Sequence, residues 1–211
     1  MNQLLILGAG GHGKVMAEAA EAKGVWDNIA FLDDRYAMLD GSLRWPVLGK
    51  IEHAGQFVSG FSHATVAVGD SRKRLEWLGI LASHGFKIPA LIHPKAWVSP
   101  SASLAEGCVV MANATVQADA RLGRGCIVNT GASVDHDCRL GEGVHICPGA
   151  SIGGEVTVGN GSWLGIGCSV IQGIRIGGHV TVGAGAAVIS DIGDCLTVVG
   201  VPARGTSRGM E

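Results

Sequence analysis

The C-terminal half of the chain carries an aliphatic residue at every sixth position, without one slip in register. A second series lies four residues after each of these positions, and most of its members are small. This period matches neither the alternation of an ordinary strand nor the 3.6-residue repeat of a helix. It predicts a triangular coil of short strands with about eighteen residues per turn. The aliphatic series is Val98, Leu104, Val110, Val116, Leu122, Val128, Val134, Leu140, Ile146, Ile152, Val158, Leu164, Val170, Ile176, Val182 and Val188.

Both series are expected to point into the prism that the coil encloses. Four of the six cysteines, Cys108, Cys126, Cys138 and Cys168, belong to the small series, so we interpret them as core residues and not as metal ligands or disulfides. Cys147 and Cys195 fall outside the pattern, and nothing pairs them. Because a thin prism buries only one stripe of each strand, its outer faces need partners, and self-association is expected.

The N-terminal part of the chain has a different pattern, in which apolar runs alternate with helical stretches. This order of strands and helices predicts a parallel sheet with a Rossmann-like arrangement. The expected strands are 3–7, 29–32, 64–68 and 87–92, and the expected helices are 14–23 and 72–84. Ligands of such sheets lie at the carboxyl ends of the strands. The segment 10–13, Asp33, Asp34 and Gly69 should gather there.

A glycine-rich loop follows the first predicted strand. Gly8, Gly10 and Gly13 fit the pattern GxGxxG, and acidic residues lie about twenty positions further on, as in dinucleotide-binding folds. Glycine lets a phosphate approach the backbone, and the start of the helix attracts its charge. The unit is about half the size of a full dinucleotide fold, so we favour a nucleotide sugar. An NAD-like ligand and no ligand remain open, and Asp33 and Asp34 could also be a solvated turn.

These patterns divide the chain into a Rossmann-like domain (1–90), a parallel β-helix (91–203) and a tail (204–211). The formal net charge of -2 gives no reason to expect nucleic acid as a partner. No apolar run approaches the roughly 18 residues that a membrane span needs. The first residues turn glycine-rich too early for a signal peptide. We therefore expect a cytoplasmic protein.

Two histidines of the coil are candidates for chemistry. His136 lies two positions after an inward aliphatic residue and His145 lies one position before the next one, so neither points into the prism. Imidazole suits proton transfer because its unperturbed pKa of about 6.5 lies near the working pH. Asp135 and Asp137 flank His136, and a carboxylate in contact with the ring would hold it and stabilise its cation. A surface histidine without a role is the simpler alternative for each.

The hexapeptide pattern over about residues 90–203 resembles the left-handed β-helix acyltransferases, which are generally trimers with active sites between subunits. Further motifs extend the resemblance along nearly the whole chain, to the UDP-4-amino-sugar N-acetyltransferases of the bacillosamine glycan pathway. Related enzymes acetylate GDP-perosamine or O-acetylate sialic acid. The motifs are GAGGHGKV, FLDD, AVGD, LIHPKAWVSPSA, VNTGASVDHDC, VHICPGA and VVGVPAR.

This resemblance implies an acetyl-CoA-dependent enzyme in which His136 is the general base and Asp137 raises its basicity. It implies that acetyl-CoA is contacted by His145, Gly154, Ile166 and Ala184. It also implies that the sugar nucleotide is bound by Gly10, Gly11, His12, Asp33, Asp34 and Gly69. Asp70 stands where that family often has asparagine. No metal is expected. The acceptor that fits best is UDP-4-amino-4,6-dideoxy-N-acetylglucosamine, which would give UDP-N,N'-diacetylbacillosamine.

Other functions remain open at this point. GDP-perosamine, a dTDP-4-amino sugar or sialic acid could be the acceptor, because His136 would serve a hydroxyl as well as an amine. A metal-dependent lyase on the same coil would need three converging histidines, and the coil offers His136, His145 and His179. A binding protein without catalysis and a serine acetyltransferase are further alternatives. The N-terminal domain disfavours the last, since serine needs no phosphate loop.

Overall fold

The computed structural model describes residues 2–39 and 41–206. The chain divides after Pro94 into two compact units, which are described separately. This boundary lies four residues after the one predicted from the sequence. Of the predicted tail, Arg204–Gly205 forms a short strand, β22, and the part from residue 207 lies outside the described residues.

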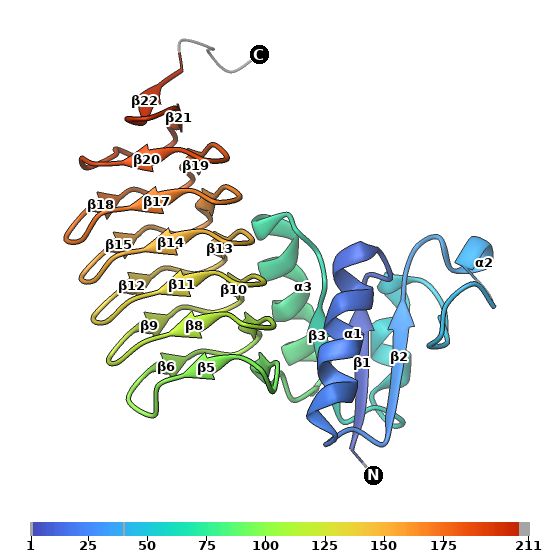
Figure 1. The fold of residues 1–211 in the computed structure, drawn as a ribbon. Coiled ribbons are helices and arrows are strands. Elements are labelled where there is room, and N and C mark those ends of the chain that lie inside the picture. The colour runs from blue at the N-terminus through green and yellow to red at the C-terminus, as the bar shows by residue number, and fades with distance from the viewer. Residues whose placement is uncertain (1, 40, 207–211) are drawn as a thin grey trace. The chain divides into compact units, whose positions relative to one another are not determined.

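The N-terminal unit is built on a three-stranded parallel sheet in the order β2-β1-β3, coloured blue to cyan in Figure 1. Its strands are β1 (Gln3–Leu7), β2 (Asn28–Leu32) and β3 (His63–Val66), and its two long helices are α1 (Gly11–Lys23) and α3 (Ser71–Ser83). These five elements confirm the predicted order. The strands are almost fully apolar because both faces of such a sheet are covered.

Three smaller elements of this unit were not predicted or were predicted differently. A short helix α2 (Tyr36–Leu39) and a 3-10 helix η1 (Ile51–Phe57) lie in the long connection between β2 and β3. The strand predicted over 87–92 is shorter: Lys87 forms only an isolated bridge with His63, and β4 comprises Leu91–Ile92. Pro89 lies between these two pieces, and proline has no backbone N–H to donate to a neighbouring strand.

The C-terminal unit is a β-helix, and each of its coils contributes short strands to three faces (Figure 1). Its strands β5 to β20 have two residues each: Trp97–Val98, Ser103–Leu104, Val109–Val110, Thr115–Val116, Arg121–Leu122, Ile127–Val128, Ser133–Val134, Arg139–Leu140, His145–Ile146, Ser151–Ile152, Thr157–Val158, Trp163–Leu164, Ser169–Val170, Arg175–Ile176, Thr181–Val182 and Ala187–Val188. The last coil ends in β21 (Thr197–Val199), which pairs antiparallel with β22.

The three faces are parallel sheets, and their register is eighteen residues except at β21, where Thr181 pairs with Thr197. One face contains β7, β10, β13, β16, β19 and β21, another contains β5, β8, β11, β14, β17 and β20, and the third contains β6, β9, β12, β15 and β18. Ile127, for example, pairs with His145, which pairs with Trp163. Residues eighteen apart therefore stack on successive coils, about 4.8 Å from one another.

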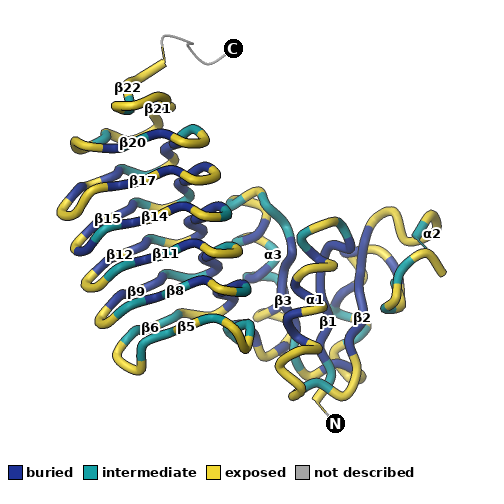
Figure 2. The backbone as a smooth tube through the Cα atoms, in the orientation of Figure 1, coloured by how far each residue is buried: buried dark blue, intermediate teal, exposed yellow. Residues whose placement is uncertain are grey.

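The predicted core of the coil is confirmed. Fourteen of the sixteen aliphatic positions are buried, and the two on the first coil, Val98 and Leu104, are partly exposed. Figure 2 shows this as dark blue segments that recur in every coil. The four cysteines of the small series are buried free thiols, as predicted.

The corners of the coil need a left-handed backbone conformation at every sixth residue. From Gly107 to Gly185, these positions have φ between 54° and 72°. Glycine occupies most of them because it adopts positive φ without a steric cost. Five of these corners carry residues other than glycine: Asn113, Asp119, Asp137, Glu155 and His179.

Candidate active site

His136 lies at the corner that follows β11, and its imidazole is about half exposed. Its Nδ1 is 2.9 Å from a carboxylate oxygen of Asp137. Its backbone N–H donates to the side chain of Asp135 at 2.8 Å. A carboxylate beside Nδ1 favours the tautomer with the proton on that nitrogen. The other ring nitrogen, Nε2, is then the one that can accept a proton.

The carboxylates around His136 make it a stronger base than an ordinary histidine. The hydrogen bond that Nδ1 donates to Asp137 raises the pKa of His136, against a smaller opposing effect of burial. The negative charges of Asp135, Asp137 and Glu155 raise it further. Neighbouring residues of a strand often point apart, so sequence alone did not guarantee contact between His136 and Asp137. Asp137 lies at a corner of the coil, where its backbone has a left-handed conformation with a φ of 59°, and its side chain contacts His136 there.

The ring of His136 lies over Gly154, which belongs to the next coil. A Cβ atom on Gly154 would lie 2.6 Å from both Cε1 and Nε2 of the imidazole, far inside van der Waals contact. The backbone N–H of Glu155 donates to the carbonyl oxygen of His136 at 2.9 Å. Because Gly154 has no side chain, the imidazole ring can lie against its backbone. The hydrogen bond between Glu155 and His136 fixes the backbones of the two coils relative to each other.

His145 points outward, as predicted, but other residues cover it. Its ring centroid is 4.3 Å from that of Trp163, which occupies the paired position on the next coil. Its Nε2 is 3.2 Å from the amide nitrogen of Asn129, two residues after its partner on the preceding coil. Only about 6% of His145 is exposed. Packing therefore fixes this ring tightly on the outer face of the coil.

Ile166 and Ala184 lie eighteen residues apart and so occupy equivalent places on successive coils. Both are exposed, Ile166 to 61%. The carbonyl oxygen of Ile166 accepts a hydrogen bond from the N–H of Gly185. These two residues form part of a column of small and aliphatic groups on the outside of the coil.

In the N-terminal unit, the glycine-rich loop joins β1 to α1. Gly8 has a φ of 100°, and Gly10 caps α1 without a side-chain hydrogen bond. A Cβ atom on Gly13 would collide with the carbonyl oxygen of Gly8, whereas one on Gly11 would meet nothing within 4 Å. The helix therefore begins directly against the strand turn, and the start of a helix is a place where phosphate groups bind in other proteins.

His12 lies in the first turn of α1, which begins three residues before the predicted helix, and it is partly buried. Burial lowers the pKa of His12 to about 4, and the positive charge of Arg74 contributes. Arg74 is fully buried and donates to the carbonyl oxygens of Val68 and Gly69, at 2.8 Å each. At neutral pH, His12 is therefore uncharged, and the backbone at Gly69 is fixed by a buried guanidinium.

The two acidic residues after β2 have different environments. Asp33 is buried, and its carboxylate accepts hydrogen bonds from the N–H of Ala9 and from the backbone and guanidinium of Arg35, at 2.9–3.1 Å. Burial alone would raise the pKa of Asp33, but these hydrogen bonds lower it to about 2. Asp34 is exposed and accepts one hydrogen bond, from the N–H of Ile51 at 3.3 Å. Asp33 thus fastens the loop, and Asp34 is the more accessible carboxylate.

Comparison with known proteins identifies relatives of this chain. Residues 3–81 match the family model "PglD N-terminal domain". The acetyltransferase domain of PglB from Neisseria gonorrhoeae, solved in complex with acetyl coenzyme A, is 47% identical over 98% of this chain and 100% of that chain, with a TM-score of 0.93. This chain belongs to the left-handed β-helix sugar N-acetyltransferases.

Two further members of this sugar N-acetyltransferase family are informative. PerB from Caulobacter crescentus, solved with CoA and GDP-perosamine, is 40% identical over 98% of each chain, with a TM-score of 0.92. The UDP-N-acetylbacillosamine N-acetyltransferase of Bacillus subtilis is 40% identical over 114 residues, which are 53% of this chain. The match spans about half the length of that curated relative, 52%.

Two residues near the sites of this family member were missed in the sequence. Glu155 lies eighteen residues after Asp137, so the repeat itself could have placed it one coil away from the His136 corner. Arg35 follows the predicted Asp33 and Asp34 directly, but only the fold reveals that its guanidinium binds Asp33. The sequence did not identify these two residues, because a single charged residue does not indicate a functional site unless its neighbours in the fold are known.

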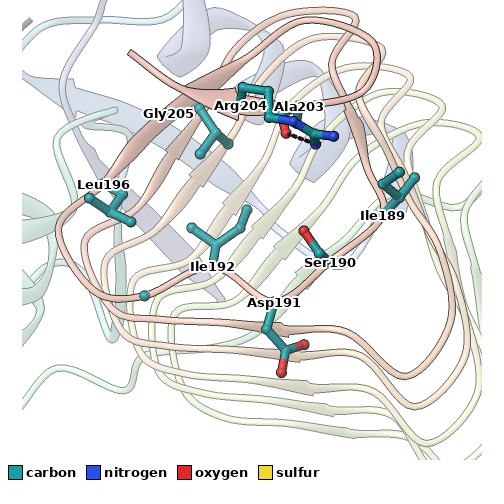
Figure 3. A pocket seen from close by; sticks show the side chains of 10 residues that line it. Ile189, Ser190, Asp191, Ile192, Leu196, Ala203, Arg204 and Gly205 are labelled. Atoms are coloured by element: carbon teal, nitrogen blue, oxygen red, sulfur yellow. Dashed lines mark hydrogen bonds between the residues drawn. The ribbon is translucent and has the colours of Figure 1, made fainter. Parts of the chain in front are cut away.

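In this chain, a separate cavity of about 400 Å³ lies on the last coils of the β-helix (Figure 3). Its lining includes Ile189, Asp191, Ile192 and Leu196, and none of the predicted site residues. Within the described residues, no group of three or more His, Cys, Asp and Glu side chains could hold a metal ion. None of the described helices is both long and apolar enough to cross a membrane.

Proposed function

We propose that this protein transfers the acetyl group of acetyl-CoA to the amino group of a nucleotide-linked amino sugar. The pairing of His136 with Asp137 carries this proposal, because it leaves Nε2 of a strengthened base exposed on the coil. The acceptor we favour is UDP-4-amino-4,6-dideoxy-N-acetylglucosamine, converted to UDP-N,N'-diacetylbacillosamine. The curated relative named as a UDP-N-acetylbacillosamine N-acetyltransferase supports this choice.

In the mechanism we propose, the amine attacks the thioester carbonyl of acetyl-CoA directly. A carbon–nitrogen bond forms, and Nε2 of His136 takes the proton that the amine loses. The carbon–sulfur bond then breaks, and the CoA sulfur receives the proton that His136 carries. Asp137 orients the ring and stabilises its cationic form during the reaction.

The cysteines of the coil support a direct transfer without an acyl-enzyme. A thiol must ionise to act as a nucleophile. Burial raises the pKa of the Cys138 thiol, of Cys147 to about 12 and of Cys168 to about 11. Cys138, the cysteine nearest His136 in the sequence, donates its S–H to the carbonyl oxygen of Gly153 at 3.1 Å. These groups remain thiols at neutral pH.

The remaining site residues, except Asp33, are assigned the roles predicted from the sequence. Acetyl-CoA is bound on the outside of the coil by His145, Gly154, Ile166 and Ala184. The sugar nucleotide is bound by Gly10, Gly11, His12, Asp34 and Gly69. Asp33 stabilises the glycine-rich loop by accepting the N–H of Ala9. The protein acts as a homotrimer in the cytoplasm. Exposed apolar side chains on the coil, among them Trp97 at 58%, support a partner subunit.

A second acceptor, GDP-perosamine, is favoured by one specific observation: PerB, solved with that nucleotide sugar, is 40% identical over nearly the whole chain. Release of free CoA thiol from acetyl-CoA distinguishes the acceptors. The panel contains UDP-4-amino-4,6-dideoxy-N-acetylglucosamine, GDP-perosamine, a dTDP-4-amino sugar, sialic acid and serine. We expect rapid turnover with the UDP sugar. Turnover with sialic acid or serine alone would overturn the nucleotide-sugar acceptor.

Replacing Gly154 by alanine is expected to lower kcat by about 10- to 100-fold, because the new methyl group would displace the ring of His136 from its place. The ring is the end of a side chain and can move away, so the free energy of unfolding should change little. Steady-state kinetics and thermal unfolding measure the two effects. Gly193→Ala is the control, since its Cβ would meet only Leu196 at 3.8 Å. An unchanged kcat in Gly154→Ala would contradict this placement of the ring.

Replacing Asp137 by asparagine is expected to shift the pH dependence of kcat/KM. His136 accepts a proton only when neutral, so the acid limb of the profile follows its pKa. The carboxylate of Asp137 raises that pKa. Its loss therefore moves the limb to lower pH and reduces the plateau about tenfold. Asp119→Asn makes the same change at the corner one turn earlier and should leave the limb in place. A limb that stays in place in Asp137→Asn would exclude this role.

A further inference from the structure

The guanidinium of Arg35 is held beside the glycine-rich loop. Its Nε and Nη2 lie 3.0 and 3.1 Å from the two carboxylate oxygens of Asp33. Nη2 is also 3.9 Å from the position that a Cβ atom on Gly10 would take. The same carboxylate accepts the N–H of Ala9, so loop and guanidinium share one anchor. Arg35 is thereby fixed next to the residue that caps α1.

Although it is held by Asp33, this guanidinium faces solvent. The side chain of Arg35 is 57% exposed, whereas that of Asp33 is only 9% exposed. Among the described residues, Nη1 makes no hydrogen bond. A guanidinium has N–H groups on three nitrogens in a fixed plane. One edge is thus used on Asp33, and the remaining N–H groups are available to a ligand.

Binding of a diphosphate at this edge of the sheet requires a positively charged side chain. Asp33 and Asp34 both lie at this edge, and acidic side chains repel a diphosphate. His12 is uncharged at neutral pH, since the pKa of His12 is lowered to about 4 by burial and by the charge of Arg74. The start of α1 attracts anions with its backbone alone, and partial charges of that kind are weaker than a full charge. Arg35 supplies a full positive charge at the place where it is needed.

We propose that Arg35 binds the diphosphate of the nucleotide-linked substrate, with Asp33 as the residue that positions its guanidinium. This inference rests on the proposed function, which supplies a nucleoside diphosphate as the ligand. It assigns a binding role to a residue that the sequence motifs leave out. It also explains why Asp33 is buried and bonded instead of facing the ligand.

Arginine suits this position better than lysine does. A guanidinium can bind a carboxylate with one edge and phosphate oxygens with the other, because its donors form a rigid fork. An ammonium group is a point charge on a flexible stem, and it would not be aligned by Asp33 in the same way. Arg35→Lys should therefore retain the charge and lose most of the geometry.

Titration calorimetry with nucleosides and their diphosphates tests this assignment. The probes are uridine with UDP and guanosine with GDP, and the diphosphate that binds the wild-type protein more tightly is pursued. Arg35→Ala is expected to weaken diphosphate binding about 10- to 100-fold and to change nucleoside binding less than about twofold. Arg35→Lys should fall between the two. Diphosphate binding by Arg35→Ala should also depend less on salt concentration.

Arg44→Ala is the matched control. Arg44 is also an exposed arginine of the N-terminal unit, and its ion pair, with Glu21 at 2.8 Å, involves no loop residue. This variant should bind the diphosphate like the wild-type protein. Equal weakening of nucleoside and diphosphate binding by Arg35→Ala would overturn the proposal, as would unchanged diphosphate binding. If the wild-type protein binds neither diphosphate, the nucleotide-sugar acceptor of the proposed function is wrong, and Arg35 loses its ligand with it.

Discussion

Replacing His136 by alanine is expected to lower kcat by about 10²–10⁴-fold, the usual contribution of a general base. The imidazole is half exposed, so its removal opens no cavity in the core of the coil. The amine would then have to lose its proton to water, without a base held at a defined place over Gly154. Because substrate binding does not need Nε2, we expect KM to change much less than kcat.

The measurement is steady-state release of CoA thiol at saturating acetyl-CoA, together with thermal unfolding of both proteins. His179→Asn serves as the control, because it removes another exposed imidazole of the coil at a corner that asparagine tolerates. That variant should retain kcat within about twofold. A folded His136→Ala protein with the kcat of the wild type would remove the general base from the mechanism.

Replacing Gly13 by alanine is expected to destabilise the N-terminal unit by at least about 3 kcal/mol. The added Cβ would collide with the carbonyl oxygen of Gly8, and a backbone atom between β1 and α1 cannot rotate away as a side chain can. Strand and helix would have to separate, which exposes the apolar surface between them. Nucleotide binding should be lost with the loop geometry.

Gly11→Ala provides a close comparison on the same helix. A Cβ atom there meets nothing within 4 Å, and alanine favours a helix over glycine by up to about 1 kcal/mol. Amide hydrogen exchange of β1 and α1 reports the local free energy of opening in each variant. We expect strong loss of protection in Gly13→Ala and unchanged or increased protection in Gly11→Ala. Equal protection in both would show that the loop is not packed as described.

The β-helix could be predicted from the sequence because its signal is local and repeated. The same inward position recurs every six residues and again requires an aliphatic side chain. An error in assigning one position therefore does not shift the positions that follow. The corners follow the same rule, since a left-handed backbone selects glycine. The N-terminal sheet was predicted from buried strands, but its connection 33–62 was not, because α2 and η1 carry no regular apolar period.

The candidate site was only partly predictable. The outward direction of His136 follows from its distance to an inward residue, and its two acidic neighbours are visible in the sequence. The burial of His145 depends on Trp163 and Asn129, which come from two other coils. Likewise, the bonds of Asp33 depend on Arg35 and on the loop of β1. Contacts between distant segments decide these environments, and a sequence pattern does not contain them.

The central claim is that an acetyl group moves from acetyl-CoA to the amine of a sugar nucleotide. Mass spectrometry of the sugar nucleotide after incubation with acetyl-CoA and the enzyme tests it most directly, combined with treatment of the product by alkaline hydroxylamine. We predict a product that is heavier by one acetyl group and resists hydroxylamine, because an amide is stable where an ester is cleaved. Loss of the acetyl group on treatment, or thioester consumption with an unchanged sugar nucleotide, would contradict the claim.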